Sequence, residues 1–258
     1  MMLLAVDIGN TGTKFGLFKK GEPFEMTFRF PTSQLQAHEH IEDELLPKLA
    51  ALGDLSSIAI ASVVPVATKA LIKILQRFHT EAAITLLEHT DIPIVNRYHH
   101  PAEVGIDRLL ASLAAYSKWG KDPKKPVIVI NLGTATTFEC ITAEGEYLGG
   151  AITLGVEAGA KYLHETAAQL PEIELVFPKN IVGTTTIESI QSGIMNGAVA
   201  MIEGLVVKLK KDVFETEDVI VIAAGGLSKL FEGKTDVIHH IAPSLVLEGI
   251  ALSAFNLQ

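Results

Sequence analysis

The sequence predicts an α/β protein built from two halves that repeat one βββαβαβ pattern. A short glycine-containing turn follows an apolar strand at residues 7–11, and the same pattern returns at residues 131–137. A second strand-like run comes directly after each turn, which is typical of a β-hairpin. A chain of 258 residues also exceeds what one core comfortably fills. We therefore expect two domains, residues 1–118 and 119–258, with a nucleotide cleft between them.

The first half reads as strands followed by alternating helices and strands. Apolar residues alternate through 2–30, with a second turn at 19–23, and predict a three-stranded antiparallel meander. Helical spacing and buried parallel-strand patterns follow. The expected elements after the meander are a helix at 35–52, a strand at 58–64, a helix at 65–78 and a strand at 83–87.

The second half repeats this order after a connecting helix at 105–119 and a charged, proline-containing stretch. A unit of this kind occurring twice is a more specific signal than simple alternation of helices and strands. The expected elements are strands at 126–132, 135–142 and 146–153, helices at 155–168 and 187–211, a strand at 218–223, a short helix after Gly225-Gly226, a strand at 235–239 and a helix at 244–255.

Charge and composition exclude several classes of protein. The 21 basic and 30 acidic residues give a net charge of −9, which disfavours nucleic acid and anionic membranes as partners. The single cysteine, Cys140, allows no intramolecular disulfide, and its apolar neighbours favour a buried thiol over a reactive one. We see no apolar run near the ~18–20 residues of a membrane span and no basic leader, so we expect a cytoplasmic protein.

The first turn carries residues suited to phosphate binding. Gly9 lets backbone N–H groups approach an anion, and Asn10 and Thr11 add donors. Asp7 would lie beside bound phosphates, where a hydrated Mg²⁺ needs one or two oxygen ligands. Lys14 could meet a phosphate oxygen as a point charge. The plainer alternatives are a turn aspartate that caps its own backbone and a solvated strand lysine.

The second turn and a later glycine pair complete the candidate nucleotide site. The candidates in the turn are Gly133, Thr134, Thr136 and Thr137. Threonine also favours strands for steric reasons, so both explanations stay open for Thr136 and Thr137. Gly225 and Gly226 follow a strand and precede a helix, where backbone can meet a base or ribose.

An Asp-Arg pair opens the connecting helix directly after Gly105. The Asp107 carboxylate could accept a proton from a substrate hydroxyl, and the Arg108 guanidinium could hold a substrate carboxylate in a bidentate fork. The alternative is a helix N-terminal acid favoured by the macrodipole and an arginine in a surface ion pair. His99 and His100 are adjacent, have no third ligand near them and do not predict a metal site.

Taken together, these motifs resemble the type III pantothenate kinases, of the superfamily that includes acetate and sugar kinases, Hsp70 and actin. The resemblance covers nearly the whole chain and implies duplicated ribonuclease H-like, actin-like ATPase domains. The blocks that carry it are 7–14, Tyr98 with 105–108, 133–137, 149–155, Thr166-Ala167 with Leu170-Pro171, Gly183 with Thr186 and Ser192-Gly193, and 225–227.

This resemblance implies transfer of the ATP γ-phosphate to the primary hydroxyl of pantothenate, the first step of coenzyme A synthesis. It implies that ATP is bound by Asp7, Gly9, Asn10, Thr11, Lys14, Gly133, Thr134, Gly225 and Gly226. It implies that pantothenate is bound by Tyr98, Gly105, Ile106, Asp107, Arg108 and Thr186. Asp107 would be the general base, Asp7 would serve the divalent ion, and the enzyme would be a homodimer that also uses K⁺ or NH₄⁺.

Two positions depart from the family pattern. Asn131 stands where the family usually has an aspartate that ligates the monovalent cation, and Leu154 stands where proline commonly precedes Gly155. An amide oxygen can still coordinate K⁺, but the lost negative charge should weaken that site. Two other functions remain open: a catalytically impaired relative that acts as a regulatory or binding protein, and a kinase for another small hydroxy acid.

Overall fold

The computed structural model describes residues 2–19 and 25–257. The chain forms two compact units, one of Met1–Ala114 with Ser244–Gln258 and one of Ala115–Pro243. Each unit contains its own mixed sheet with helices, which confirms the predicted α/β class of two repeated halves. We describe the units separately.

The sheet of the first unit has the strand order β3-β2-β1-β4-β5. Strands β1, β2 and β3 pair antiparallel, as the predicted meander requires, whereas β4 and β5 run parallel to β1. The strands are β1 (Met2–Ile8), β2 (Gly12–Lys19), β3 (Glu25–Pro31), β4 (Ser57–Ser62) and β5 (Ala83–Leu86). The short β6 (Val95–Asn96) also lies in residues 1–114 but is not a strand of this sheet. From Leu3 to Ile8, β1 is entirely buried, because helices cover both faces of this central strand.

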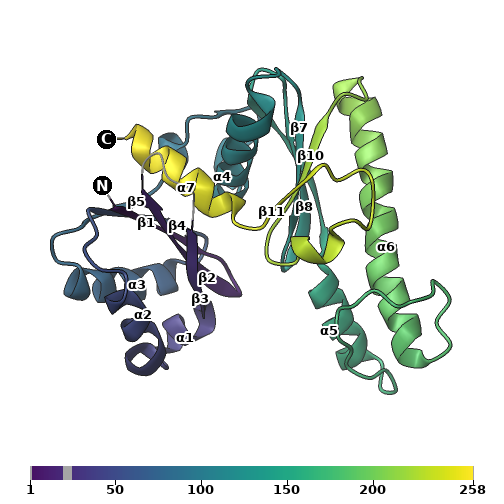
Figure 1. Ribbon diagram of the computed structural model, residues 1–258, viewed down its shortest axis with the longest axis horizontal. Helices are drawn as coiled ribbons and strands as arrows, with labels where there is room; N and C mark the ends of the chain where they lie inside the picture. Colours follow the sequence, from purple (N-terminus) through teal and green to yellow (C-terminus); the bar gives the residue numbers. More distant parts are fainter. Residues whose placement is uncertain (1, 20–24, 258) are drawn as a thin grey trace. The chain divides into compact units, whose positions relative to one another are not determined.

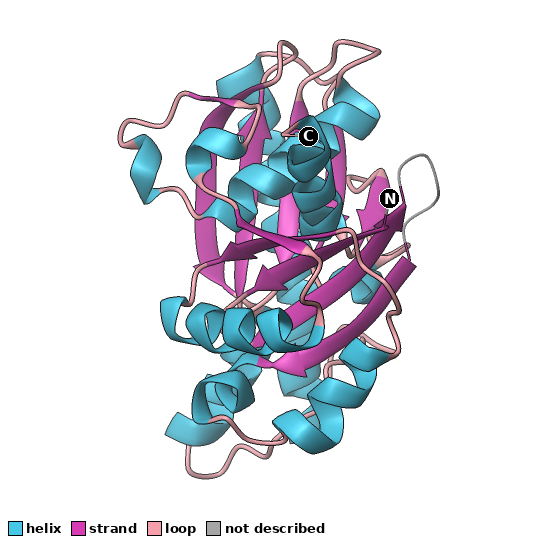
Figure 2. Cartoon of the chain, turned by 90° about the vertical axis from the view of Figure 1, so that its left-hand side faces the viewer, coloured by secondary structure: helices cyan, strands magenta, loops and turns pink. Residues whose placement is uncertain are grey.

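Helices lie on both sides of this sheet (Figure 1). One side carries α1 (Thr32–Ala37), α2 (Leu46–Ala50) and α3 (Pro65–Phe78), and the other carries α7 (Leu245–Asn256), which packs on β1, β2 and β4. Figure 2 shows from a second direction that a layer of helices lies beneath these strands. The helix α4 (Ile106–Ala115) packs so closely on α7 that a side chain at Gly249 would collide with the Leu110 carbonyl.

The expected single helix over 35–52 was wrong, because the chain breaks it. Helix α1 ends at Ala37, and His38 and His40 both take left-handed backbone angles, with φ of 58° and 54°. A π-helical turn, η1 (Ile41–Leu45), then leads into α2. Pro47 lies in the first turn of α2 and has no N–H to continue a hydrogen-bond ladder from the preceding turn.

The sheet of the second unit runs in the order β11-β10-β7-β8-β9. Strands β7, β8 and β9 form an antiparallel meander, and β10 and β11 extend it in parallel with β7. The strands are β7 (Val127–Leu132), β8 (Ala135–Ile141), β9 (Glu146–Leu154), β10 (Ile220–Ala224) and β11 (His240–Ala242). This is the predicted repeat of the first unit's order.

The helices of this unit pack on one face of the sheet, where Phe138 and Phe231 lie in the core. They are α5 (Val156–Thr166) and α6 (Thr186–Leu209), with the short segments η5 (Lys210–Phe214) and η6 (Ser228–Phe231). The further short segment η4 (Tyr116–Gly120) contacts β7. Together α6 and η5 form one helical stretch that is long and apolar enough to cross a bilayer by length and composition. An apolar stretch of this length was not expected from the sequence, and 33% of its most apolar window is buried. Met195, Ile202 and Val206 of this stretch are fully buried in the core, and a core helix passes the same test.

Two expectations for the last part of the chain differ from the structure. The strand expected at 235–239 was wrong, because Val237 lies in a turn and Ile238 in the irregular segment after it, and β11 starts only at His240. Both side chains pack against the core. The final helix packs in the first unit although it follows the second in sequence. The compact units therefore differ from residues 1–118 and 119–258 chiefly by this helix.

Candidate functional site

The first candidate turn joins β1 to β2 and is held from outside the hairpin. The Gly9 N–H donates to the Gly12 carbonyl at 3.2 Å, which closes the turn. The hydroxyl of Thr32, at the start of α1, donates to the Gly9 carbonyl at 2.7 Å and lies 3.1 Å from the hydroxyl of Thr13. Both threonines are fully buried. This hydrogen bond was not identified from the sequence, because a threonine such as Thr32 is common at the start of a helix.

Asp7 and Lys14 face each other across the same hairpin. They are register partners on β1 and β2, and Lys14 Nζ lies 3.3 Å from Asp7 Oδ2. The Asp7 side chain is 9% exposed and that of Lys14 is 23% exposed. Because Mg²⁺ in nucleotide sites needs only one or two protein carboxylates besides phosphate oxygens and waters, Asp7 fits such a role. Asn10 and Thr11, at the tip of the turn, are exposed.

The predicted Asp-Arg pair occupies the first turn of α4. The Gly105 carbonyl accepts the N–H groups of Arg108 at 3.0 Å and of Leu109 at 3.4 Å. The Asp107 carboxylate folds back toward Gly105, so that a Cβ on Gly105 would lie 2.5 Å from Asp107 Oδ1. Asp107 and Arg108 are both half-buried. Glycine at 105 therefore makes room for the carboxylate that was proposed as the base.

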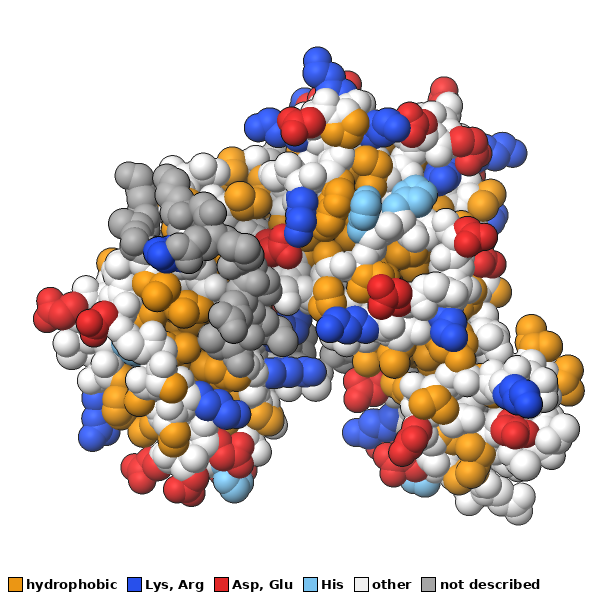
Figure 3. All heavy atoms as spheres, viewed as in Figure 1, with side chains coloured by type: hydrophobic (Ala, Val, Ile, Leu, Met, Phe, Trp, Pro, Cys, Tyr) orange, Lys and Arg blue, Asp and Glu red, His pale blue; other side chains and the backbone are white. Residues whose placement is uncertain are grey.

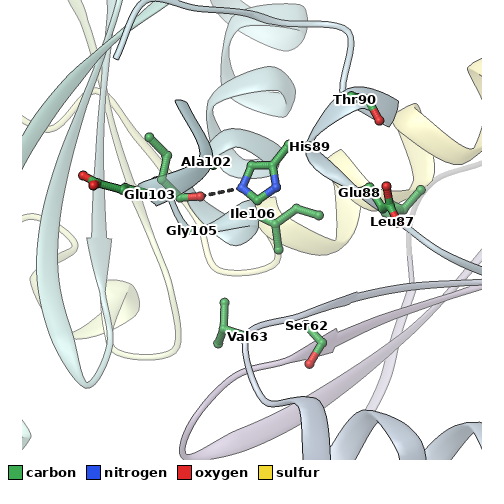
Figure 4. A pocket seen from close by; sticks show the side chains of 11 residues that line it. Ser62, Val63, Leu87, Glu88, His89, Thr90, Ala102, Glu103, Gly105 and Ile106 are labelled. Atoms are coloured by element: carbon green, nitrogen blue, oxygen red, sulfur yellow. Dashed lines mark hydrogen bonds between the residues drawn. The ribbon is translucent and has the colours of Figure 1, made fainter. Parts of the chain in front are cut away.

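A cavity of about 460 Å³ lies within the first unit, beside the start of α4 (Figure 4). Gly105 and Ile106 line one side, and Ser62 and Val63, at the end of β4, line another. Ser62 is the register partner of Ile8, the residue after Asp7. The sheet thus brings the end of β1 and the start of α4 to the borders of one region. Tyr98 is half-buried in the preceding loop, where its N–H donates to Asn96 Oδ1 at 2.9 Å.

The second candidate turn joins β7 to β8 and contacts the start of α5. The Gly133 N–H donates to the Ala135 carbonyl at 3.1 Å, and the Gly155 N–H donates to the Thr134 carbonyl at 3.2 Å. A Cβ on Gly155 would lie 2.8 Å from the Thr134 carbonyl carbon and closer still to two carbonyl oxygens. Gly155 is the N-cap of α5 and offers no side-chain cap. This 11-residue helix therefore begins against the turn with the backbone N–H groups that favour anions.

Gly225 and Gly226 follow β10 and differ in their surroundings. Gly225 has a φ of +87°, and a Cβ there would lie 2.5 Å from both Asn131 Oδ1 and the Leu132 carbonyl oxygen. A Cβ on Gly226 would meet nothing within 4 Å among the described residues. The Gly225 position thus serves packing against β7, whereas Gly226 faces open space. The side chain of Asn131 reaches the Gly225 backbone.

The strand β8 buries the two threonines that had two open explanations. Thr136 is 1% exposed, and Thr137 is 9% exposed with an Oγ1 that has no hydrogen-bond partner among the described residues. On the same strand, burial raises the pKa of Cys140 to about 12, with a further contribution from the Glu139 carboxylate. Cys140 is therefore a core thiol and no nucleophile.

Thr186 opens α6 in the second unit and is exposed. The preceding Thr185 is the N-cap, and its Oγ1 accepts the N–H of Glu188 at 3.2 Å. The Glu188 carboxylate accepts the N–H and the hydroxyl of Thr184, both at 2.9 Å, and these bonds hold the pKa of Glu188 below its usual value. The candidate residues thus form one set in each unit. Asp7, Lys14, Tyr98, Asp107 and Arg108 belong to the first, and Asn131, Gly133, Thr134, Thr186, Gly225 and Gly226 belong to the second.

Comparison with known sequences gives one consistent family. A family model described as Type III pantothenate kinase matches residues 3–208. A Type III pantothenate kinase 1 from Symbiobacterium thermophilum is 36% identical over 260 residues, which cover 97% of this chain and 95% of the relative. A Type III pantothenate kinase from Roseiflexus castenholzii is 37% identical over 259 residues, covering 97% of each chain.

Solved structures show the same fold at low sequence identity. A putative 2-dehydro-3-deoxygalactonokinase from Sinorhizobium meliloti aligns with a TM-score of 0.61 at 14% identity, covering 99% of this chain and 96% of the other. A conserved putative Baf family transcriptional activator from Campylobacter jejuni aligns with a TM-score of 0.60 at 17% identity, covering 98% of both chains. These likenesses confirm the duplicated ribonuclease H-like, actin-like fold.

Proposed function

Because the chain belongs to the type III pantothenate kinase family, we propose that it transfers the γ-phosphate of ATP to the primary hydroxyl of pantothenate. The observation that carries this proposal is the family match over nearly the full length of the chain. The residues matched by the family model include both glycine turns and the Asp-Arg pair at the start of α4. The reaction is the first step of coenzyme A synthesis.

We assign the nucleotide phosphates to the turn between β1 and β2 and the turn between β7 and β8. In the first unit, Gly9 closes the turn, and the exposed Asn10 and Thr11 and the Lys14 ammonium supply donors. In the second, Gly133 closes the turn, and the start of α5, which lies against Thr134, offers N–H groups. Phosphoryl transfer has a loose transition state, so positioning and charge neutralisation supply most of the acceleration. The hydrogen bonds from Thr32 and to the Thr134 carbonyl keep these turns in place before ATP binds.

Asp7 is assigned to the divalent ion that accompanies ATP. When bound, Mg²⁺ would neutralise charge on the phosphate oxygens. The chain's own contribution is a carboxylate that β1 and β2 hold in place, with Lys14 Nζ at 3.3 Å to orient it. We further propose that the Asn131 amide oxygen takes part in a weakened monovalent-cation site, tested by comparing activity in Na⁺, K⁺ and NH₄⁺ buffers.

Asp107 is assigned as the general base and Arg108 as the partner of the pantothenate carboxylate. A base must lie within hydrogen-bond reach of the hydroxyl that it deprotonates. Gly105 and Ile106, the residues directly before Asp107, line the 460 Å³ cavity, which makes this cavity the candidate pocket for the acceptor. Its carboxylate-bearing lining residues, Glu88 and Glu103, would repel an anionic group, so the substrate carboxylate is better placed toward Arg108.

Replacing these two residues tests the assignment. Asp107→Asn should lower kcat by roughly 100- to 10,000-fold with little change in ATP binding, because only proton transfer is lost. Arg108→Ala should mainly raise the KM for pantothenate, by about tenfold or more. Lys73→Ala, an exposed change on α3, is the control and should match the wild type. Near-normal turnover of Asp107→Asn, or an unchanged pantothenate KM in Arg108→Ala, would remove the respective role.

We also propose that the enzyme is a homodimer, joined through the second unit. Large apolar side chains are exposed around α5 and the start of α6, and Figure 3 shows hydrophobic surface over this region. They include Leu154 at 60%, Tyr162 at 61%, Ile181 at 75% and Val182 at 74% exposure. Several large apolar side chains exposed in one region often mark an interface. Light scattering should give twice the 27.7 kDa chain mass, and Val182→Asp should give the monomer.

A non-catalytic regulatory protein is the competing function. The first unit keeps Asp7 buried beside Lys14 and Asp107 at the start of α4, positions that a binding protein has no chemical need to retain. The family comparisons also name kinases. An ATP-consumption assay with and without pantothenate decides between them, because a regulator would show no pantothenate-dependent turnover.

A further inference from the structure

A short capped turn after β5 carries an imidazole into the cavity of the first unit. Strand pairing continues to Leu87, whose N–H donates to the Ile60 carbonyl at 2.8 Å. The next residues form η2 (His89–Asp91), closed by a reciprocal cap in which the Glu88 N–H donates to Asp91 Oδ2 at 2.8 Å. Leu87 is 3% exposed, so its burial anchors the turn. The backbone under His89 is therefore fixed to the same sheet that carries Asp7.

The His89 ring meets the backbone directly before the catalytic helix. His89 Nε2 lies 2.6 Å from the carbonyl oxygen of Val104, and Figure 4 shows this bond across the cavity wall. A carbonyl can only accept, so Nε2 carries the proton and donates. In the same view the Glu103 carboxylate points away from the ring. The bond joins residues 15 positions apart and links the end of β5 to the start of α4.

Val104 connects the core to the segment that carries the proposed base. Its side chain is 1% exposed, so the core fixes one side of this residue, and His89 fixes the carbonyl on the other. That carbonyl belongs to the peptide bond of Gly105, and glycine has the softest backbone in the chain. Without the imidazole, rotation of this peptide would move Gly105 and with it the first turn of α4, including Asp107.

We propose that His89 is a positioning residue for the phosphoryl transfer: its Nε2–H holds the Val104–Gly105 peptide so that the Asp107 carboxylate meets the acceptor hydroxyl. This inference rests on the proposed function of Asp107. His89 is itself exposed toward the cavity, so water replaces its bond to the carbonyl when the ring is removed. Its loss should therefore affect geometry much more than global stability.

The test compares His89→Leu with His89→Gln. Leucine fills similar space and cannot donate, whereas the glutamine amide places an N–H₂ group near the position of Nε2. His89→Leu should lower kcat about tenfold or more with the KM for ATP unchanged, because a small displacement of a catalytic group is costly. His89→Gln should restore most of the loss. Thr85→Val, an exposed and isosteric change on β5, is the matched control.

Hydrogen exchange of the Arg108 and Leu109 amides gives a readout that needs no activity. Both amides donate to the Gly105 carbonyl, so they should exchange faster in His89→Leu and return toward the wild-type rate in His89→Gln. Wild-type kcat and exchange in His89→Leu would overturn the proposal, as would equal loss in both variants with exchange unchanged. If the wild type does not phosphorylate pantothenate, the proposed function fails instead, and the exchange measurement still reports on the bond.

Discussion

Two adjacent glycines after β10 should respond in opposite ways to the same substitution. Gly225 has a φ of +87° and packs against Asn131 Oδ1 and the Leu132 carbonyl oxygen, both 2.5 Å from where a Cβ would stand. Gly226 has neither constraint, since its φ is outside the left-handed range and a Cβ there would meet nothing within 4 Å among the described residues. We expect Gly225→Ala to destabilise the fold and Gly226→Ala to leave it intact.

The magnitude follows from these contacts. A left-handed backbone costs an L-residue roughly 1–2 kcal/mol. Overpacking against fixed backbone, here the Leu132 carbonyl, costs roughly 1–3 kcal/mol more. The loss of about 2–5 kcal/mol corresponds to a fall in Tm of roughly 4–20 °C for a chain of this size. Gly226→Ala should instead raise stability by about 0.4–1 kcal/mol, because alanine restricts the unfolded chain.

Thermal unfolding and ATP kinetics separate the two roles. Gly225→Ala should unfold at a lower temperature. Gly226→Ala should melt roughly 1–4 °C higher and show a raised KM for ATP if the nucleotide passes over that backbone. Gly204→Ala is the control, because this exposed glycine of α6 also has open space around its Cβ position and lies outside both turns. A Gly225→Ala protein that melts within about 1 °C of the wild type would refute the argument from φ and close approach.

Three further predictions concern single side chains. Cys140, with a pKa of about 12, should not react with a thiol reagent at pH 8 until the protein is unfolded in guanidinium; rapid native reaction would contradict its burial. His239 accepts the Val221 N–H at Nδ1, and burial and nearby lysines lower its pKa. The free energy of unfolding should therefore fall as the pH drops below 6.5, the pKa of histidine in the unfolded chain, and His239→Asn, which keeps an acceptor, should remove that pH dependence in melting curves. Thr185→Ala removes the acceptor for the Glu188 N–H and should cost about 1 kcal/mol in chemical denaturation, with a smaller effect from the conservative Thr185→Ser.

Regular elements were predictable where one local signal dominated. The helix expected at 65–78 matches α3 (Pro65–Phe78), because Pro65 marks its start and its apolar positions repeat with helical spacing. The break at His38 and His40 was missed, since positive φ is uncommon for any residue other than glycine and both histidines interrupt a helical pattern. The last helix lies in the first unit because α7 packs on β1, β2 and β4, and its Gly249 packs against Leu110. All of these contacts join parts of the chain that are far apart in sequence.

The candidate site shows the same division between local and distant signals. The glycine turns and the Asp-Arg pair were found because their residue types and order are local. The groups that hold them were missed: Thr32 on the Gly9 carbonyl, Gly155 against Thr134, and His89 on the Val104 carbonyl. Each is a backbone contact made by a residue from a different element, and no spacing along the chain reports it.

These distant contacts also explain how mobile turns can act as fixed phosphate sites. A turn with glycine gains access to an anion but loses rigidity, because glycine populates many backbone states. Thr32 and the N–H of Gly155 each bind a carbonyl of the turn, which orients the neighbouring peptide without occupying its N–H groups. The N–H groups of Gly9 and Gly133 bond within their own turns, and this fixes the positions of Asn10 and of the start of α5 as donors for a ligand. Preorganised donors of this kind cost no reorganisation at the moment of reaction, and this is the main way a protein accelerates phosphoryl transfer.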